Sequence, residues 1–205
     1  MRLQSLDLLQ LSVPYTYVRL YTRLSMKIRM NNRLIWIDIE TTGLNLKRDR
    51  ILEVAIIVTE ADLTIVAESP VVVINQSSEL LGSMDRWCLT THGKNGLLEK
   101  VMLCTTTESQ AEDELLEFLE LHSQSGTSPM CGNNVGFDRK FINKYMPRLN
   151  EFFKYRNIDV STINELARLW KSDLPEYTKT YSHRALDDIR ESIGELRHYR
   201  ENWLQ

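Results

Sequence analysis

The ten residues Leu34–Gly43, which read L-I-W-I-D-I-E-T-T-G, constrain the fold of this chain more than any other stretch. Their apolar, β-branched character predicts a buried strand over Leu34–Glu40 that ends in a polar turn. Side chains alternate between the two faces of a strand, so the three isoleucines share one face and Trp36, Asp38 and Glu40 share the other. The strand therefore delivers two carboxylates to one face at its carboxyl end.

The two carboxylates at the end of this strand need a physical explanation, because like charges this close together repel each other. Burying them without a partner is costly. A divalent cation relieves the repulsion, and oxygen ligands at this spacing suit Mg²⁺ or Mn²⁺. The alternative interpretation is a strand that runs into a solvated loop with ordinary surface carboxylates. These ten residues alone leave both interpretations open.

Composition narrows the class of protein, and the chain is long enough for one sizeable domain. Its three cysteines are odd in number and lack C-x-x-C spacing, which indicates reduced thiols in an intracellular protein rather than a zinc site or a disulfide framework. No apolar run approaches the roughly 20 residues that a membrane helix requires, so we expect no membrane partner. The net charge of −3 argues against a binder of long duplexes, but it permits a small nucleic-acid substrate at an acidic metal site.

The segments after the first strand predict hairpins, followed by alternating strands and helices. Ile51–Thr59 is apolar and β-branched, and Thr64–Ile74 continues as a third strand, in which Pro70 marks either an interruption or an edge. Connections this short force antiparallel hairpins. Short strands are expected over Met130–Gly132 and Asn157–Val160. This order of elements implies an α/β fold with a mixed central sheet flanked by helices.

Apolar residues at helical spacing predict the helices. Met84, Trp87 and Cys88 fit one face of a short helix within Ser77–Gly96. Ser161 suits the N-cap position of the helix that follows the last short strand. The remaining helices are expected over Ser109–His122, Gly136–Tyr145, Thr162–Trp170 and Ala185–Tyr199.

Two further acids and one histidine stand in unusual settings. Asp138 follows the tight turn G-N-N-V-G near the start of a helix. Asp188 falls at the edge of the apolar stripe on the last helix, whereas Asp187 points further into solvent. His183 precedes Asp188 by five residues, in the loop that leads into this helix. Each alone has an ordinary explanation, because the helix dipole favours a first-turn acid and a loop histidine is common.

Taken in order, these residues form three motifs. The first, D-I-E, carries Asp38 and Glu40, and the second, G-N-N-V-G-F-D, ends at Asp138. The third, H-R-A-L-D-D, has the pattern H-x-A-x-x-D from His183 to Asp188. Together they resemble the histidine-containing branch of the Asp-Glu-Asp-Asp 3′–5′ exonuclease superfamily. Linking segments such as W-I-D-I-E-T-T-G-L, K-Y-M-P and D-D-I-R-E-S bring the resemblance closer to the oligoribonuclease family, from the first strand to the end of the chain.

The resemblance implies a ribonuclease H-like 3′–5′ exonuclease fold and hydrolysis with two metal ions. Two ions roughly 3.5–4 Å apart can clamp the attacking and leaving oxygens of a phosphodiester. By resemblance, His183 is the general base that takes a proton from the attacking water, and a histidine pKa of about 6.5 suits that task at neutral pH. Its loop position predicts that it swings in when substrate binds. The residues implied to hold two Mg²⁺ or Mn²⁺ ions are Asp38, Glu40, Asp138 and Asp188.

Oligoribonucleases act on very short RNA, down to dinucleotides, so the products implied are nucleoside 5′-monophosphates. Such a substrate offers few phosphates, and base–aromatic stacking contributes roughly 1–3 kcal/mol per base. Leu44 and Trp87 match family positions that pack against the two bases. The alternative for Trp87 is a core tryptophan on the same face as Met84. His92 matches a family position near the substrate phosphate.

In this family a phosphate cap is said to close off the far end of the dinucleotide. Arg156, Ser161 and Thr162 match that segment, and arginine suits a terminal phosphate because its planar fork donates two hydrogen bonds. Tyr155 matches a tyrosine that the partner subunit contributes, so the resemblance implies a homodimer. Asn134 stands where the family usually has serine, and its amide can still donate to a phosphate.

Two other functions remain open on the sequence. A proofreading-type or tRNA-trimming exonuclease of the same superfamily would share the five catalytic residues but accept longer strands. Trp87 together with Arg156–Thr162 argues for the shorter substrate. A catalytically silent nucleic-acid-binding module would have lost a carboxylate or His183, and all five residues are present.

Residues 1–30 form an N-terminal extension, and residues 31–205 are expected to form the exonuclease domain. An Arg-rich, acid-poor leader is typical of a mitochondrial transit peptide. The alternative, which we favour, is a start codon assigned too early, with Met26 or Met30 as the true beginning. We therefore expect an extension without a core role and a cytoplasmic protein, or a mitochondrial one if the leader is a transit peptide. Its charged residues are Arg2, Asp7, Arg19, Arg23, Lys27 and Arg29.

Overall fold

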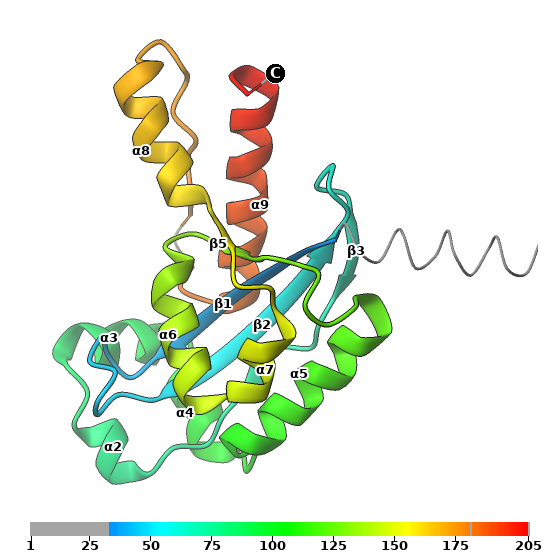
Figure 1. Cartoon of the computed structure of the whole chain (residues 1–205). Coiled ribbons are helices and arrows are strands. Elements are labelled where there is room, and N and C mark those ends of the chain that lie inside the picture. Colours follow the sequence, from blue (N-terminus) through cyan, green and yellow to red (C-terminus); the bar gives the residue numbers. More distant parts are fainter. Residues whose placement is uncertain (1–32, 181, 205) are drawn as a thin grey trace, which may run out of the picture.

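The computed structural model describes residues 33–180 and 182–204, so the extension over residues 1–30 lies outside the described residues. The described strands are β1 (Leu34–Thr41), β2 (Ile51–Thr59), β3 (Ile65–Glu68), β4 (Val72–Val73), β5 (Met130–Gly132) and β6 (Asn157–Asp159). They form one mixed sheet in the order β3-β2-β1-β5-β6, with β4 also paired to β2 (Figure 1). β2 runs antiparallel to β1, β3 and β4, whereas β5 runs parallel to β1 and β6.

The predicted hairpins and the mixed sheet are confirmed. β2 covers the expected residues, and the third predicted strand is divided into β3 and β4 on either side of Pro70. Proline cannot donate a ladder hydrogen bond, which explains the division. Between β3 and β4, the Ser69 hydroxyl accepts a hydrogen bond from the backbone N–H of Ile56 on β2 at 2.9 Å.

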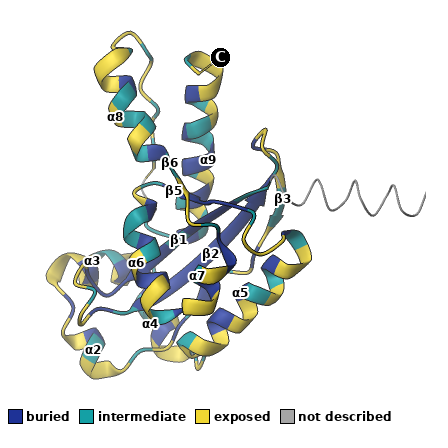
Figure 2. Ribbon diagram, viewed as in Figure 1, coloured by how far each residue is buried: buried dark blue, intermediate teal, exposed yellow. Residues whose placement is uncertain are grey.

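The helices cover both faces of the sheet, as Figure 1 shows. One face of β1 carries its three isoleucines into a core with α5, α6 and α7. The other face carries Trp36 into a core with α8 and α9, and its indole N–H donates to the Thr59 hydroxyl at 3.0 Å. The buried strands lie between these layers in Figure 2. The helix bounds are α2 (Ser78–Gly82), α3 (Arg86–Lys94), α4 (Leu97–Leu103), α5 (Glu108–His122), α6 (Val135–Tyr145), α7 (Pro147–Phe152), α8 (Val160–Trp170) and α9 (Ala185–Asn202).

Two local predictions about helices were wrong. Met84 and Cys88 are buried as expected, but Trp87 is 58% exposed. Because α3 starts only at Arg86, Met84 lies outside it, and the three residues do not share one helix face. Ser161 lies inside α8, where the N-cap is Asp159 and its carboxylate accepts from the Ser161 N–H at 3.0 Å. A carboxylate at the N-cap satisfies a free helix N–H as well as a serine does.

A β-bulge shapes the carboxyl end of β1. The pairing of β1 with β2 shifts between Glu40 and Thr41, because Glu40 faces Glu53 while Thr41 faces Ile51. The additional residue, Leu52, is fully buried in a third apolar cluster with α2, α3 and α4. Bulges re-aim side chains next to active sites. None of the described helices is long and apolar enough to cross a bilayer.

Candidate active site

β1, α9 and the loop before α9 bring acidic and histidine side chains to the carboxyl end of β1. β1 itself supplies Asp38 and Glu40 on the face that α9 covers, and α9 supplies Asp188 in its first turn. His183 lies just before α9. Among the described residues, ligand atoms of Glu40, His183 and Asp188 all lie within 4.8 Å of one another. The carboxyl ends of strands in open α/β sheets are the usual place for ligands.

Asp138 reaches the same region from α6. It is buried, and its Oδ1 accepts a hydrogen bond from the backbone N–H of Ile39 at 3.2 Å, between Asp38 and Glu40 on β1. The close approach of β5 to β1 makes this possible, because a side chain at Gly132 would place its Cβ 3.0 Å from the Ile37 carbonyl oxygen. The turn into α6 passes through Asn134 at φ 50°, a left-handed conformation that asparagine tolerates.

Burial raises the pKa values of all four carboxylates, and neighbouring carboxylates of the cluster add to it at Asp38 and Glu40. Burial first, and then the charges of Asp138 and Glu40, hold the pKa of Asp38 well above its ordinary value. Burial and the neighbouring Asp188 charge raise the pKa of Glu40 to about 8. Burial raises the pKa of Asp138 to about 7, against hydrogen bonds that lower it. The pKa of Asp188 rises to about 6, also mainly through burial, and the charge of His183 lowers it.

This donor set fits a divalent metal ion. Carboxylate oxygens and one imidazole suit a hard or borderline cation. The raised pKa values mean that the protein alone does not neutralise these acids, so a cation would favour their charged forms. The residues available to hold metal are Asp38, Glu40, Asp138 and Asp188, with His183 beside them.

The structure separates the two adjacent acids of α9. Asp188 is half-buried and lies in the cluster, whereas Asp187 is exposed and pairs with Arg190 at 3.1 Å. The helical period places successive residues about 100° apart, which accounts for the difference. This placement agrees with the orientation expected from the apolar stripe.

His183 is held in place by several contacts. Its backbone has φ 52°, and its carbonyl oxygen accepts a hydrogen bond from the Asn95 side-chain amide at 2.7 Å. Its ring lies edge-on to Trp87, with 5.2 Å between the ring centroids. The next residue, Arg184, forms hydrogen bonds with both carboxylate oxygens of Glu53. The imidazole is thus already at the acidic cluster in this structure.

The side chains expected to contact bases are exposed. Leu44 is 79% exposed on the turn after β1, and Trp87 lies on the open side of α3. Asp49 fixes this turn, because its carboxylate accepts from the Asn45 N–H at 2.7 Å. A side chain at Gly43 would place its Cβ 2.5 Å from the same carboxylate, so the turn requires glycine there. A rigid turn therefore presents Leu44 to solvent.

His92 differs from the other expected substrate contacts, because it is buried. Its Nε2 lies 3.1 Å from the Thr41 carbonyl oxygen and 3.9 Å from a Glu40 carboxylate oxygen. Its Nδ1 has no hydrogen-bond partner within the part of the chain that the structure describes. Burial lowers the pKa of His92, so we expect a neutral ring at neutral pH.

The residues expected at the phosphate cap divide into two groups. The backbone N–H of Asn134 donates to Asp159 Oδ1 at 2.9 Å and to Ser161 Oγ at 3.3 Å, so the two expected residues are in contact. Tyr155 and Arg156 are exposed, and the guanidinium carbon of Arg156 lies 4.9 Å from the centroid of the Tyr155 ring. Thr162 is also exposed.

Sequence reasoning missed four residues that shape this site. Glu53 is a charge within an otherwise apolar strand, a signal that could have indicated a buried partner, and Arg184 lies inside the third motif. Asp159 precedes a predicted helix, where a short acid often caps. Asn95 gives no local signal, because its partner lies 88 residues away.

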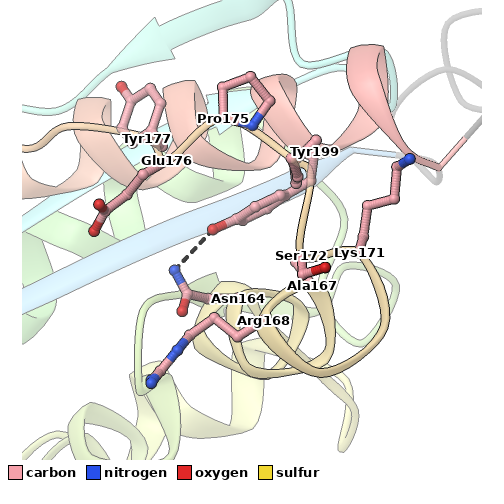
Figure 3. A pocket seen from close by; sticks show the side chains of 10 residues that line it. Asn164, Ala167, Arg168, Lys171, Ser172, Pro175, Glu176, Tyr177 and Tyr199 are labelled. Carbon is pink, nitrogen blue, oxygen red and sulfur yellow. Dashed lines mark hydrogen bonds between the residues drawn. The ribbon is translucent and has the colours of Figure 1, made fainter.

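A separate hollow of about 360 Å³ lies between α8, α9 and the segment that joins them (Figure 3). Asn164 on α8 donates a hydrogen bond across it to the Tyr199 hydroxyl at 2.7 Å. None of the candidate site residues lines this hollow. The residues that do are Asn164, Ala167, Arg168, Lys171, Ser172, Leu174, Pro175, Glu176, Tyr177 and Tyr199.

The fold is that of a ribonuclease H-like 3′–5′ exonuclease. Exonuclease I from Methylocaldum szegediense superposes with a TM-score of 0.65 at 19% identity, over 84% of this chain and 41% of that one. An E. coli exonuclease I in complex with a dA16 oligonucleotide gives a TM-score of 0.67 at 14% identity, over 84% and 42% of the two chains. The zinc-bound form of an E. coli exonuclease I–ssDNA complex is equally similar. This chain spans about two fifths of the length of these proteins, and the likeness shows the fold alone.

Sequence comparisons identify the family. The family model described as exonuclease matches residues 35–196. The oligoribonuclease of Marinobacter nauticus is 54% identical over 175 residues, which is 85% of this chain and 97% of that protein. The Alcanivorax borkumensis oligoribonuclease is 52% identical over 84% and 96% of the two chains. The chain therefore belongs to the oligoribonuclease family of exonucleases, and is a hydrolase.

Proposed function

We propose that this protein is a 3′–5′ exoribonuclease that hydrolyses very short RNA, dinucleotides above all, to nucleoside 5′-monophosphates. One observation supports this most directly: a chain 54% identical to an oligoribonuclease brings Glu40, His183 and Asp188 within 4.8 Å of one another. A binding module would not require this cluster of mutually repelling acids, which costs stability unless a cation relieves it.

Asp38, Glu40, Asp138 and Asp188 would hold two Mg²⁺ or Mn²⁺ ions. When bound, such ions supply charge neutralisation at the phosphate and a more acidic water. The protein contributes fixed ligands, because Asp138 is tied to the backbone of β1 and β1 is buried on both faces. Fixed ligands need no reorganisation during the reaction.

His183 acts as the general base in this proposal. The water oxygen forms a bond to phosphorus, its proton passes to the imidazole, and the bond from phosphorus to the bridging 3′ oxygen breaks. The leaving 3′ oxygen takes up a proton from solvent and becomes the 3′-hydroxyl of the shortened RNA. The products are a nucleoside 5′-monophosphate and an RNA one nucleotide shorter. Only a base within reach of the attacked phosphate can act in this way, and His183 lies beside the metal-binding acids.

Leu44 and Trp87 support the choice of a short substrate. Both are exposed apolar side chains, Leu44 on the turn that follows Glu40 and Trp87 in contact with the His183 ring. Stacking of bases would replace the many phosphate contacts that a long strand offers, at roughly 1–3 kcal/mol per base. Arg156, on an exposed segment, would bind the terminal phosphate, with Asn134, Ser161 and Thr162 close to the carboxyl end of β6.

A homodimer is part of the proposal. Tyr155 is 79% exposed, which suits a side chain that completes the site of a second copy. Size-exclusion chromatography with light scattering tests this directly, and a monomer that is fully active would contradict it.

The decisive experiment compares RNA of two and seven nucleotides. Purified protein is mixed with Mg²⁺ and end-labelled RNA, with EDTA as the control, and initial kcat/KM is measured for each length. We expect metal-dependent cleavage with the dinucleotide clearly faster. Preference for the longer strand would retain the exonuclease chemistry but assign the protein to the proofreading or trimming group. If neither the dinucleotide nor the seven-nucleotide RNA is cleaved in a metal-dependent way, the proposed function is wrong.

A further inference from the structure

Several contacts hold His183, and their catalytic meaning rests on the proposed function, in which this residue is the general base. A flexible loop would let His183 swing in with substrate. In the structure, however, the residue occupies a left-handed backbone conformation with φ 52°. That conformation is unfavourable for a residue other than glycine and persists only where neighbours impose it. The contacts that impose it therefore matter.

Asn95 makes the contact with His183 itself. It is half-buried at the corner between α3 and α4, immediately before Gly96 with φ 77°. Its Oδ1 accepts from the Leu97 N–H at 3.1 Å, which fixes the orientation of its amide. Its Nδ2 then donates to the His183 carbonyl oxygen at 2.7 Å. One side chain thus joins the start of α4 to the loop before α9.

The Glu53–Arg184 ion pair makes the contact on the other side. Glu53 is fully buried on β2, and its carboxylate accepts from Arg184 Nη2 at 2.8 Å and from the Ala185 N–H at 3.0 Å. These bonds fix the two residues that follow His183. The ion pair is partly buried and bidentate, a geometry that orients the arginine side chain strongly.

We propose that Asn95 is a positioning residue that, together with the Glu53–Arg184 pair, holds His183 at the acidic cluster before substrate arrives. Asn95 acts on the backbone of His183 and not on its imidazole. Its role is to keep one conformation of the loop populated. Loss of its hydrogen bond therefore reduces the fraction of enzyme with His183 in place, which lowers kcat.

Asn95 is the better residue to test, because removing Arg184 would leave Glu53 buried without a partner. Asn95→Asp keeps an oxygen for the Leu97 N–H but cannot donate to the His183 carbonyl. Asn95→Ala removes both bonds. Asn75→Ala is the matched control, because Asn75 donates from its amide to the carbonyls of Val101 and Cys104, at the opposite end of α4.

The kinetic test measures dinucleotide hydrolysis at saturating Mg²⁺. We expect kcat to fall about fivefold to tenfold in Asn95→Asp and Asn95→Ala, the range that one lost hydrogen bond supports, with KM within about twofold. Asn75→Ala should match the wild type. In a His183→Ala background, Asn95→Ala should have no further effect, because the side chain that it positions is absent.

A second readout does not depend on activity. The chain has four histidines, so the ring signals of metal-free protein in ¹H–¹³C NMR can be assigned, with His183→Ala identifying one of them. We expect a single sharp His183 signal in the wild type and in Asn75→Ala. In Asn95→Asp that signal should shift or broaden, because the loop samples more than one conformation.

The outcomes separate the two proposals. An inactive wild type refutes the proposed function. An active wild type with unchanged kcat and an unchanged His183 signal in both Asn95 variants overturns the positioning role and leaves the function intact. A loss of kcat that persists at the same size in the His183→Ala background also overturns it, because the effect would then be a general structural one.

Discussion

Glu40 and Glu53 face each other across β1 and β2, and both are buried, yet the protein treats their charges in opposite ways. Glu53 forms an ion pair with Arg184 at 2.8 Å. Glu40 makes no ion pair with a lysine or arginine among the described residues, and it lies near Asp38 and Asp188 instead. A fold that can neutralise one acid leaves its neighbour unneutralised. The difference distinguishes an acid that maintains the fold from acids that require an added cation.

The largest effect is expected at Asp188, an acid of the unneutralised cluster around Glu40. Asp188→Asn removes one charge from this cluster, and we expect kcat for dinucleotide cleavage to fall about 1,000-fold or more. The matched control is Asp187→Asn, which alters the exposed neighbour and should change kcat less than about twofold. Steady-state kinetics on both variants measures this. A larger loss of kcat in Asp187→Asn than in Asp188→Asn would show that Asp187 is the catalytic acid.

Removing the partner of Glu53 tests whether this buried acid depends on its ion pair for stability. Arg184→Ala leaves a buried charge without compensation, so we expect a loss of about 3 kcal/mol in the free energy of unfolding. Arg190→Ala breaks the exposed pairs with Glu68 and Asp187 and should cost less than about 1 kcal/mol. Urea denaturation measures both. Equal losses would show that Glu53 does not depend on its partner.

The charge at Glu40 should destabilise the metal-free protein. In the unfolded chain Glu40 loses its proton near pH 4.3, whereas in the folded protein its pKa is raised to about 8. Between these two pH values only the unfolded chain gains by losing the proton, so the free energy of unfolding falls as pH rises, and it is constant above them. We expect Glu40→Gln to raise the Tm of metal-free protein by roughly 5 °C at pH 8 and hardly at all at pH 4.

The matched control for that experiment is Glu53→Gln, which weakens the ion pair with Arg184 and should lower the Tm at pH 8. Saturating Mg²⁺ should also raise the Tm of the wild type, because ligand binding favours the folded state. A Glu40→Gln protein that is less stable than the wild type at pH 8 without metal would contradict the contrast between the two acids.

The smallest expected effect concerns substrate binding at Trp87. We expect Trp87→Ala to raise the dinucleotide KM about tenfold, as the loss of one stacked base would. Trp170→Ala removes a similarly exposed tryptophan from α8 and should leave KM unchanged. If KM is unchanged in Trp87→Ala as well, the ring does not bind a base.

Patterns within a few residues predicted the strands of the sheet correctly. The alternation along β1 separated the isoleucines from Asp38 and Glu40, and Pro70 marked the division between β3 and β4. The same kind of reasoning failed at Trp87, because spacing alone cannot show where a helix starts. Met84 lies before α3, so a spacing that assumed one helix over Met84, Trp87 and Cys88 assigned Trp87 to the buried face.

The strands, their hairpins, the helical stripes of the longer helices and the order of the acidic motifs could therefore be predicted from local sequence. These follow from backbone geometry and side-chain polarity within a few residues. Which charges meet depends on the packing of the layers, because Glu53 and Arg184 lie 131 residues apart and Asn95 and His183 lie 88 apart. Contacts over such distances depend on how the layers pack, and packing depends on the whole chain at once. That packing also leaves Glu40 unneutralised beside Glu53.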